Sequence, residues 1–162
     1  MANGYDPIAA IAYARRWAFG RNPAYLDFHG LGGDCTNFVS QCLYAGAKVM
    51  NWTPVYGWYY VDGERRTASW TGVEYLYRFL TANKGPGPYA RQTAALLAEP
   101  GDVVQLAFEG KPYTHAALIV AIENGEIYVA AHTTDEWMKP LSAYGHQQRR
   151  FLHIEGVRQP NA

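Results

Sequence analysis

The sequence predicts a single α+β domain in which N-terminal helices pack on an antiparallel β-sheet. Apolar residues recur at helical spacing in the first half of the chain, whereas short β-rich segments bounded by turn residues fill the second half. Helices followed by a run of strands are typical of this class. The chain has 162 residues, 49% of them apolar, which suits one core, and we expect residues 1–162 to form one domain.

Three helices are expected: the first from after Asp6 to Gly20, the second from Cys35 to Gly46, and the third over residues 72–83. Pro7 falls in the first turn of the first helix, where its missing N–H costs no hydrogen bond. Asp34 directly precedes the second helix and is its expected N-cap. Loops are predicted for the irregular, aromatic-rich residues 51–70 and for the Gly-Pro-Gly-Pro run at 85–88.

The predicted strands cover residues 102–108, 113–122, 126–132 and 149–157. Between the second and the third, Asn124-Gly125 favours a two-residue type I′ hairpin turn. That turn fixes a register with Ala121 opposite Tyr128, Ile119 opposite Ala130, and Ala117 opposite His132. Because side chains alternate along a strand, His115 shares a face with Ala117. His115 and His132 are therefore expected to be diagonal neighbours within reach of each other.

The composition argues against several kinds of partner. Lys and Arg together number 14, as do Asp and Glu, so the zero formal charge gives no electrostatic footprint for nucleic acid or an anionic membrane. No apolar run reaches the length of a membrane span, so no membrane insertion is expected. Aromatic residues make up 15% of the chain. Their flat apolar faces and polar tips suit sugars or peptides, although they also fill cores.

Cys35 has the surroundings of a reactive thiol. Two glycines and Asp34 precede it and a helix follows, so its sulfur lies at a helix N-terminus. The helix dipole and the first-turn N–H groups there favour a thiolate and can stabilise an oxyanion. Cys42 lies about 10 Å along the same helix on its apolar stripe, so we expect two free thiols. A small buried residue at a helix start is the simpler alternative for Cys35.

His115 and His132 complete a candidate catalytic set. One ring nitrogen of His115 would take the thiol proton, and His132 would hold the other nitrogen. Two alternatives stay open: ordinary sheet histidines, or a zinc site formed by Cys35, His115 and His132, although the usual close ligand pairs are absent. The remaining histidines have no comparable setting, namely His29, His146 and His153.

Four segments resemble the amidase domain of bacterial cell-wall hydrolases, a relative of the NlpC/P60 and CHAP groups within the papain-like fold. They are GGDCTNFVSQCLYAG at 32–46, PGDVVQL at 100–106, THAALIV at 114–120 and YVAAHTTD at 128–135. The stretch 9–28 is also similar to the start of that domain, so the resemblance spans most of the chain. It implies a papain-like (NlpC/P60-type) arrangement, in which a helix carries the nucleophile and an antiparallel sheet carries the base.

The resemblance also assigns roles to single residues. Cys35 matches the nucleophile, His115 the base and His132 the third polar group, with Asp135 as an alternative for that third role. Tyr25 is the candidate for the oxyanion, because the glutamine that papain-like proteases place before the nucleophile is absent here. The further candidates for oxyanion or substrate contact are Asp34, Thr36 and Trp58.

Together these features predict a cysteine hydrolase that cleaves an amide or peptide bond through a Cys35 thioester, with a peptidoglycan stem peptide as substrate. Two alternatives are acyl transfer from the same thioester and a non-catalytic cell-wall or glycan-binding module. No metal or other cofactor is expected. The resemblance suggests action outside the membrane, although MANGYDP at the start lacks the segments of a signal peptide. The sequence leaves the oligomeric state open.

Overall fold

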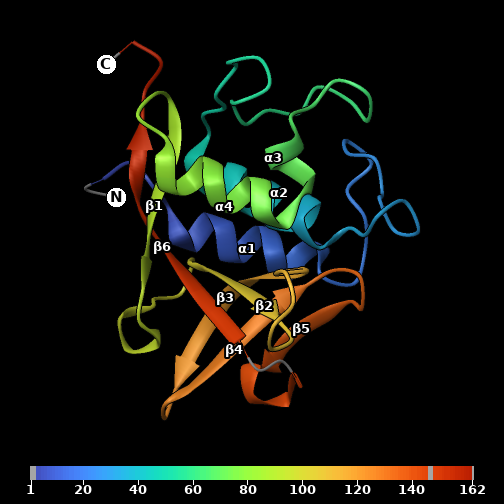
Figure 1. Ribbon diagram of the computed structural model, residues 1–162, viewed down its shortest axis with the longest axis vertical. Helices are drawn as coiled ribbons and strands as arrows, with labels where there is room; N and C mark the ends of the chain where they lie inside the picture. Colours follow the sequence, from blue (N-terminus) through green and yellow to red (C-terminus); the bar gives the residue numbers. More distant parts are fainter. Residues whose placement is uncertain (1–2, 146–147, 162) are drawn as a thin grey trace.

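Four helices and six strands make up the described part of the chain, residues 3–145 and 148–161, in a computed structural model (Figure 1). The helices are α1 (Pro7–Trp17), α2 (Cys35–Ala47), α3 (Ala68–Thr71) and α4 (Val73–Ala82). The strands are β1 (Gly87–Thr93), β2 (Val103–Ala107), β3 (His115–Glu123), β4 (Glu126–Ala131), β5 (Glu136–Pro140) and β6 (Gln148–Arg158). Two short 3₁₀ turns, Ala95–Leu97 and Leu141–Ala143, join them. His146 lies outside the described residues.

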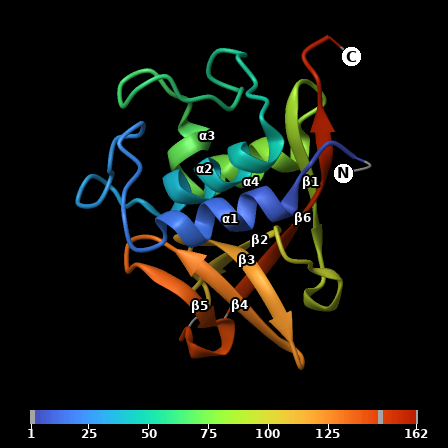
Figure 2. The ribbon, with the colours of Figure 1, turned by 180° about the vertical axis from the view of Figure 1, so that it is seen from behind.

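All six strands pair antiparallel in one sheet, in the order β1-β6-β2-β3-β4-β5. Figures 1 and 2 show α1, α2 and α4 together on one side of the molecule, with β2–β5 fanning out beneath them and β6 running along its length. The predicted α+β class, with helices packed on an antiparallel sheet, is therefore confirmed. Among the described residues, no helix is long and apolar enough to cross a membrane.

Helix α2 is the centre of the core. Eleven of its thirteen residues are buried, polar ones included, because the sheet covers one side and the other helices cover the rest. Gly46 allows α1 to start close by: the Asp6 N–H donates to the Gly46 carbonyl oxygen at 2.9 Å. A Cβ on Gly46 would lie only 2.6 Å from the Asp6 carbonyl oxygen. The N-terminal end of α1 is thereby fixed against the C-terminal end of α2.

The predicted helices are present, with small changes at their ends. The Asp6 side chain caps α1 by accepting the Ala9 N–H at 3.1 Å, and Pro7 occupies the first turn as expected. That helix stops at Trp17, three residues before the predicted Gly20. Helix α2 begins at Cys35 as predicted and continues one residue past Gly46, where Lys48 adopts a left-handed conformation.

Two strands were not predicted, β1 and β5. Strand β1 begins inside the Gly-Pro-Gly-Pro run, which is tolerated because this edge strand pairs only with β6. Strand β5 is the opposite edge, and its half-buried residues show no apolar alternation. Within the predicted irregular segment 51–70, α3 starts at Ala68, and two isolated bridges pair Asn51 with Trp58 and Tyr60 with Arg66.

The β3–β4 hairpin has the predicted turn but not the predicted register along its whole length. Asn124 and Gly125 both have positive φ, as a type I′ turn requires. Ala121 lies opposite Tyr128 as predicted, but a bulge follows, and Leu118 rather than Ile119 then lies opposite Ala130. A slip of one residue reverses which side chains share a face. The expected placement of His132 opposite Ala117 is therefore wrong.

Candidate active site

Cys35 is the first residue of α2, and its side chain is 7% exposed. The Sγ atom lies 3.8 Å from Thr36 Oγ1 and 4.0 Å from the carbonyl oxygen of Thr114. Thr114 directly precedes His115, the first residue of β3. The structure thus brings the thiol to the start of the strand that carries the predicted base. Thr36 itself is fully buried, so its side chain borders the sulfur rather than a solvent-facing surface.

The two cysteines differ in setting, as the sequence indicates. Both are free. Cys42 is fully buried in the apolar cluster around α2, and burial raises the pKa of its thiol well above the ordinary value. A thiol of that kind is chemically inert. Cys35 is therefore the cysteine whose position permits chemistry.

A cavity of about 340 Å³ lies beside His115. Its lining comes from β3, from β5 and from the segments that follow β4 and β5, namely His115, Thr133, Thr134, Glu136, Lys139 and Tyr144. The Tyr144 ring packs 5.6 Å from the His115 ring, centroid to centroid. Burial, together with the charges of Glu136 and Cys35, raises the pKa of Tyr144 to about 12. Its hydroxyl is therefore protonated at neutral pH.

The loop before α2 contains two glycines and passes beside the cavity. Gly32 and Gly33 have φ angles of 98° and 101°, a region that side chains other than glycine rarely adopt. A Cβ on Gly33 would lie 3.6 Å from Thr133 Oγ1, so this loop passes close to a residue that lines the cavity. The loop that leads to Cys35 therefore depends on glycine for its conformation.

His132 is not the partner of His115. Its Nδ1 lies 2.5 Å from Asp34 Oδ2 and its Nε2 lies 2.8 Å from the carbonyl oxygen of Trp17, so both ring nitrogens are engaged elsewhere. The ring stacks on Phe38 of α2, with centroids 4.0 Å apart. Since the bulge turns His132 toward the helices, the predicted hydrogen bond to His115 is replaced by one to Asp34. The alternative zinc site loses a ligand for the same reason.

Asp34 occupies the N-cap position of α2, but its side chain does not cap the helix. It is fully buried and accepts hydrogen bonds from the Phe28 N–H at 2.8 Å and from Asn37 Nδ2 at 2.9 Å, besides its contact with His132. Substrate therefore cannot reach this carboxylate, and the predicted substrate contact is wrong. Asp34 instead fixes the residue that immediately precedes the thiol.

Arg21, which is partly exposed, lies next to the buried pair of Asp34 and His132. Its guanidinium makes two 3.0 Å hydrogen bonds to Asp135 and an ion pair with Asp27 at 3.1 Å, and it approaches Asp34 at 3.7 Å. Burial by itself lowers the pKa of Arg21, but the hydrogen bonds to Asp135 and Asp27 outweigh it and raise the pKa. Asp135, the alternative partner for His115, is thus committed to Arg21.

Two aromatic candidates belong to the core. Trp58 is fully buried, donates from Nε1 to Ser40 Oγ at 3.1 Å and packs on Trp70, so the expectation that it contacts substrate is wrong. The ring centroid of Tyr25 lies 4.9 Å from that of Tyr60 and 6.1 Å from that of Trp70. Burial above all raises the pKa of Tyr25 to about 12. The contacts of Tyr25 place it in this aromatic cluster, and an oxyanion role for it stays a prediction.

Sequence reasoning missed Tyr144 and Arg21. Tyr144 follows the short 3₁₀ turn Leu141–Ala143, and no local pattern marks it, because its neighbours His115 and Cys35 come from β3 and α2. Arg21 was visible only as a loop residue after the first helix. The two acidic residues in the motifs, Asp34 and Asp135, were a signal that a cationic side chain lies near them.

The fold and the site together define an α+β domain that presents a cysteine at a helix N-terminus next to a strand-borne histidine and a cavity. The chain belongs to the family described as "Putative amidase domain", which matches residues 4–154. That description indicates hydrolysis of amide bonds.

Two relatives are uncharacterized proteins of Bacillus subtilis (strain 168). YhbB is 34% identical over 138 residues, covering 83% of this chain and 43% of YhbB. YjcM is 23% identical over 163 residues, covering 96% of this chain and 37% of YjcM. The chain therefore spans about two fifths of the length of these relatives. No solved structure matches.

Proposed function

We propose that the protein is a cysteine amidase of the papain-like type, with Cys35 as nucleophile and His115 as general acid and base. The observation that supports this most is the position of Cys35 Sγ, 4.0 Å from the carbonyl oxygen of the residue that precedes His115. The thiol stands at the N-terminus of a thirteen-residue helix, where the dipole favours its anionic form. The family assignment supports the amide as the bond that is cleaved.

In the proposed mechanism His115 takes the proton of Cys35, and the thiolate attacks the carbonyl carbon of the amide. Backbone N–H groups in the first turn of α2 stabilise the oxyanion of the tetrahedral intermediate. His115 then gives its proton to the leaving nitrogen, the C–N bond breaks and a thioester remains. Water, deprotonated by His115, attacks the thioester and releases the acid, which restores the thiol.

Asp34 and His132 serve as positioning residues in this proposal. Asp34 adjoins Cys35 in the chain, and its buried contact with His132 ties the start of α2 to the end of β4. Nδ1 of His132 contacts Asp34 and Nε2 contacts the carbonyl oxygen of Trp17, so the ring joins the start of α2, the end of α1 and the end of β4. The position of Cys35 at the start of α2 then depends on a buried contact that substrate does not reach.

The cavity beside His115 supports a peptide as substrate. At about 340 Å³ it has the size of a small ligand pocket, and it offers two threonine hydroxyls, the Glu136 carboxylate and the Lys139 ammonium. Such a lining suits a polar peptide with charged groups. A stem peptide of peptidoglycan is the substrate we propose, on the basis of the resemblance to cell-wall hydrolases.

The first test is the rate of iodoacetamide alkylation of Cys35 against pH, followed by mass spectrometry, in wild type and His115→Ala. A paired thiol should react below about pH 7, well under the free-thiol value of about 8.5, and the profile should move to higher pH in His115→Ala. Cys42→Ala is the matched control and should leave the profile unchanged. Identical profiles with and without His115 would refute the pair.

Activity is then measured on peptidoglycan fragments, with products identified by mass spectrometry. Cys35→Ala should lower turnover by roughly 10³-fold or more, whereas Cys42→Ala should retain it. Adding a competing amine distinguishes hydrolysis from acyl transfer, because the thioester would then yield a new amide. Retained hydrolysis in Cys35→Ala would rule out the cysteine mechanism.

A further inference from the structure

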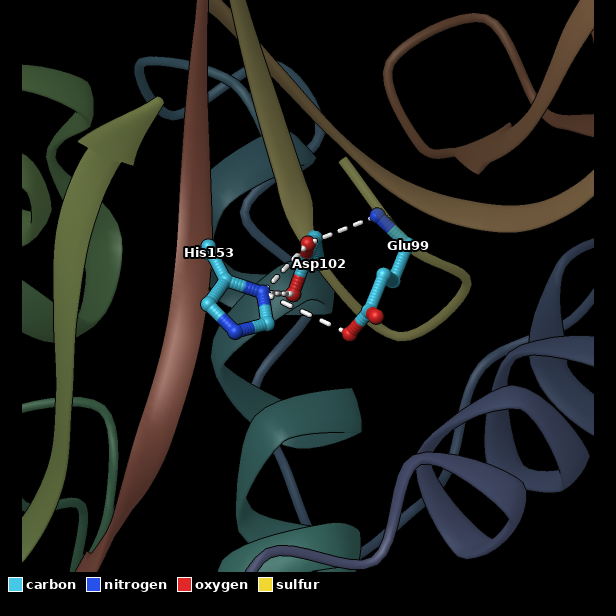
Figure 3. A group of neighbouring side chains, drawn as sticks. All are labelled: Glu99, Asp102 and His153. Atoms are coloured by element: carbon cyan, nitrogen blue, oxygen red, sulfur yellow. Dashed lines mark hydrogen bonds and ion pairs between the residues drawn. The ribbon is translucent and has the colours of Figure 1, made fainter. Parts of the chain in front are cut away.

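A second group of ionisable side chains lies at the other end of strand β2. Asp102 precedes β2, His153 lies in β6, and Glu99 lies in the turn that leads into Asp102 (Figure 3). Leu106, four residues after Asp102, is the residue that pairs with His115. At the rise of a strand, four residues correspond to about 13 Å, so this group is separate from the candidate active site.

The three side chains converge on one point. His153 Nδ1 lies 2.9 Å from Asp102 Oδ2 and 3.2 Å from Asp102 Oδ1. The same nitrogen lies 3.7 Å from Glu99 Oε2. Figure 3 shows both carboxylates directed at this edge of the imidazole. Among the described residues, these three form a group whose ligand atoms all lie within 4.8 Å of one another.

These distances match the spacing of ligand atoms around a metal ion. With bonds of about 2.1 Å to nitrogen and oxygen, adjacent ligand atoms are about 3.0 Å apart in an octahedron and about 3.4 Å apart in a tetrahedron. The contacts from His153 to Asp102 already fall near these values. The longer one involves Glu99, whose side chain is 68% exposed and can move closer.

Asp102 is held in place for this role. It is buried, and its two oxygens accept the Ile154 N–H at 3.0 Å and the Glu99 N–H at 2.8 Å. Each carboxylate oxygen has a second lone pair, and these are directed toward His153. Because Asp102 is buried, a cation at this point would compensate for the hydration that its carboxylate lacks.

A cavity of about 270 Å³ adjoins the group and opens toward solvent. Its lining includes Asn3, Tyr5 and Pro7 from the N-terminal segment as well as the three ionisable residues. The cavity provides a path for an ion and room for the water ligands that would complete its coordination. Because three protein ligands leave positions open, a bound ion would retain exchangeable sites.

We propose that Glu99, Asp102 and His153 bind one divalent transition-metal ion, for which Zn²⁺ is the best match. An imidazole with two carboxylates suits Zn²⁺ better than Mg²⁺ or Ca²⁺, which prefer oxygen ligands alone. The ion replaces the proton on His153 Nδ1, and the ring keeps its hydrogen on Nε2. The bound ion ties the turn that carries Glu99 to β6, and it takes no part in the chemistry at Cys35.

The test is isothermal titration of the full chain with Zn²⁺, and separately with Mg²⁺. One Zn²⁺ should bind per chain, more tightly than Mg²⁺, and Cys35→Ala should bind it equally well. Glu99→Gln and His153→Gln should each weaken binding at least tenfold. Glu99→Gln changes only an exposed side chain, so its folding is not at risk. Glu155→Gln, an acid on the same strand that pairs with Arg91, is the control and should bind as wild type does.

Thermal unfolding gives a second measurement. Zn²⁺ should raise the Tm of wild type and of Glu155→Gln by several degrees but leave that of Glu99→Gln unchanged, since a ligand that binds only the folded state stabilises it. Binding that is lost in Cys35→Ala and kept in His153→Gln would overturn the proposal, as would the absence of saturable binding below millimolar Zn²⁺. The contacts of His153 with Glu99 and Asp102 would then be ion pairs without a bound metal.

Discussion

The Asp34 carboxylate holds three segments from one buried position. Its oxygens accept hydrogen from the loop at Phe28 and from Asn37 of α2, and Oδ2 lies 2.5 Å from Nδ1 of His132. A buried carboxylate is tolerated only with such partners, because an unpaired one would lose its hydration without compensation. The carboxylate next to the thiol is therefore held by hydrogen bonds from three separate segments of the chain.

Replacing Asp34 by Asn should destabilise the fold by about 3 kcal/mol, because it leaves the buried His132 ring without its charged partner. The quantity to measure is the free energy of unfolding in urea at neutral pH. Asp27→Asn is the matched control: Asp27 also pairs with Arg21, but its side chain is 43% exposed, and the loss should stay below about 1 kcal/mol. Equal losses in the two variants would contradict this account of Asp34.

At this scale the local sequence predicted a reactive thiol at Cys35 but not the residues that hold the start of α2 in place. The glycines, Asp34 and the helix start around Cys35 are local, so they could be interpreted from neighbours in the chain. The contacts of Asp34 with His132 and of Arg21 with Asp135 join residues far apart in the chain, and only the packing of α2 against β4 brings them together. Trp58 likewise gave no sign of burial, because a tryptophan in a loop-rich segment suits a core and a surface equally.

One extra residue in β3 decides the arrangement of the histidines. The bulge between Ile119 and Ala121 shifts the pairing so that Leu118 faces Ala130. A turn sequence specifies the register only until the first irregularity, and bulges leave no reliable mark in a run of small apolar residues. The edge strands β1 and β5 escaped prediction for a related reason, since they pair on one side only and need no apolar alternation.

Because α1 and α2 are in close contact at Gly46, replacing this glycine by alanine should destabilise the protein, although helix propensity alone predicts the opposite. Alanine normally stabilises a helix by about 1 kcal/mol relative to glycine. At Gly46, however, a Cβ would lie 2.6 Å from the Asp6 carbonyl oxygen and 2.7 Å from Tyr5 Cε1. Gly46→Ala should therefore destabilise the protein by about 2 kcal/mol, measured by urea unfolding.

Gly145→Ala serves as the control for this change, because, apart from its chain neighbours, none of the described residues has an atom within 4 Å of the Cβ it would add. Its free energy of unfolding should differ from wild type by less than about 0.5 kcal/mol. A Gly46→Ala protein as stable as wild type would show that the two helices can separate without cost.

At the scale of the whole molecule, the tyrosines range from buried, as at Tyr5, to exposed, as at Tyr56. The chain has 13 of them. Burial above all raises the pKa of Tyr25 and Tyr144 to about 12, and it raises those of Tyr5 and Tyr13 further. In the unfolded chain these phenols ionise near the ordinary value of 10.0. Above that pH the unfolded state releases protons that the folded state retains, so proton loss favours unfolding.

The free energy of unfolding should therefore be unaffected by these groups below about pH 10 and should fall as the pH rises from 10 toward 12. Urea unfolding at several alkaline pH values measures the fall, and phenolate absorbance follows the ionisation. Tyr25→Phe should make the fall smaller. Tyr56→Phe, at a side chain that is 84% exposed, should not. If both variants lose stability as wild type does, burial of these phenols is not the cause.

The class of the fold was predictable because it depends on where periodicity changes from helical to alternating, which the first and second halves of the chain show clearly. The order of the strands in the sheet and the contacts between distant segments were not predictable in this way. Whether β6 lies between β1 and β2, or whether Glu99 meets His153, depends on pairings between distant segments that a single sequence does not encode locally.

The N-terminal segment has a consequence for the topology of the domain. The Asn3 carbonyl oxygen accepts the Val157 N–H at 2.9 Å, and the Asn3 side chain donates to the Glu155 carbonyl oxygen at 2.7 Å. The pairing of β6 with β2 ends at Leu152, so Asn3 takes the place beside β6 that β2 leaves open. A variant without these two hydrogen bonds would present an unpaired strand edge there, which is the kind of edge at which sheets of different molecules join.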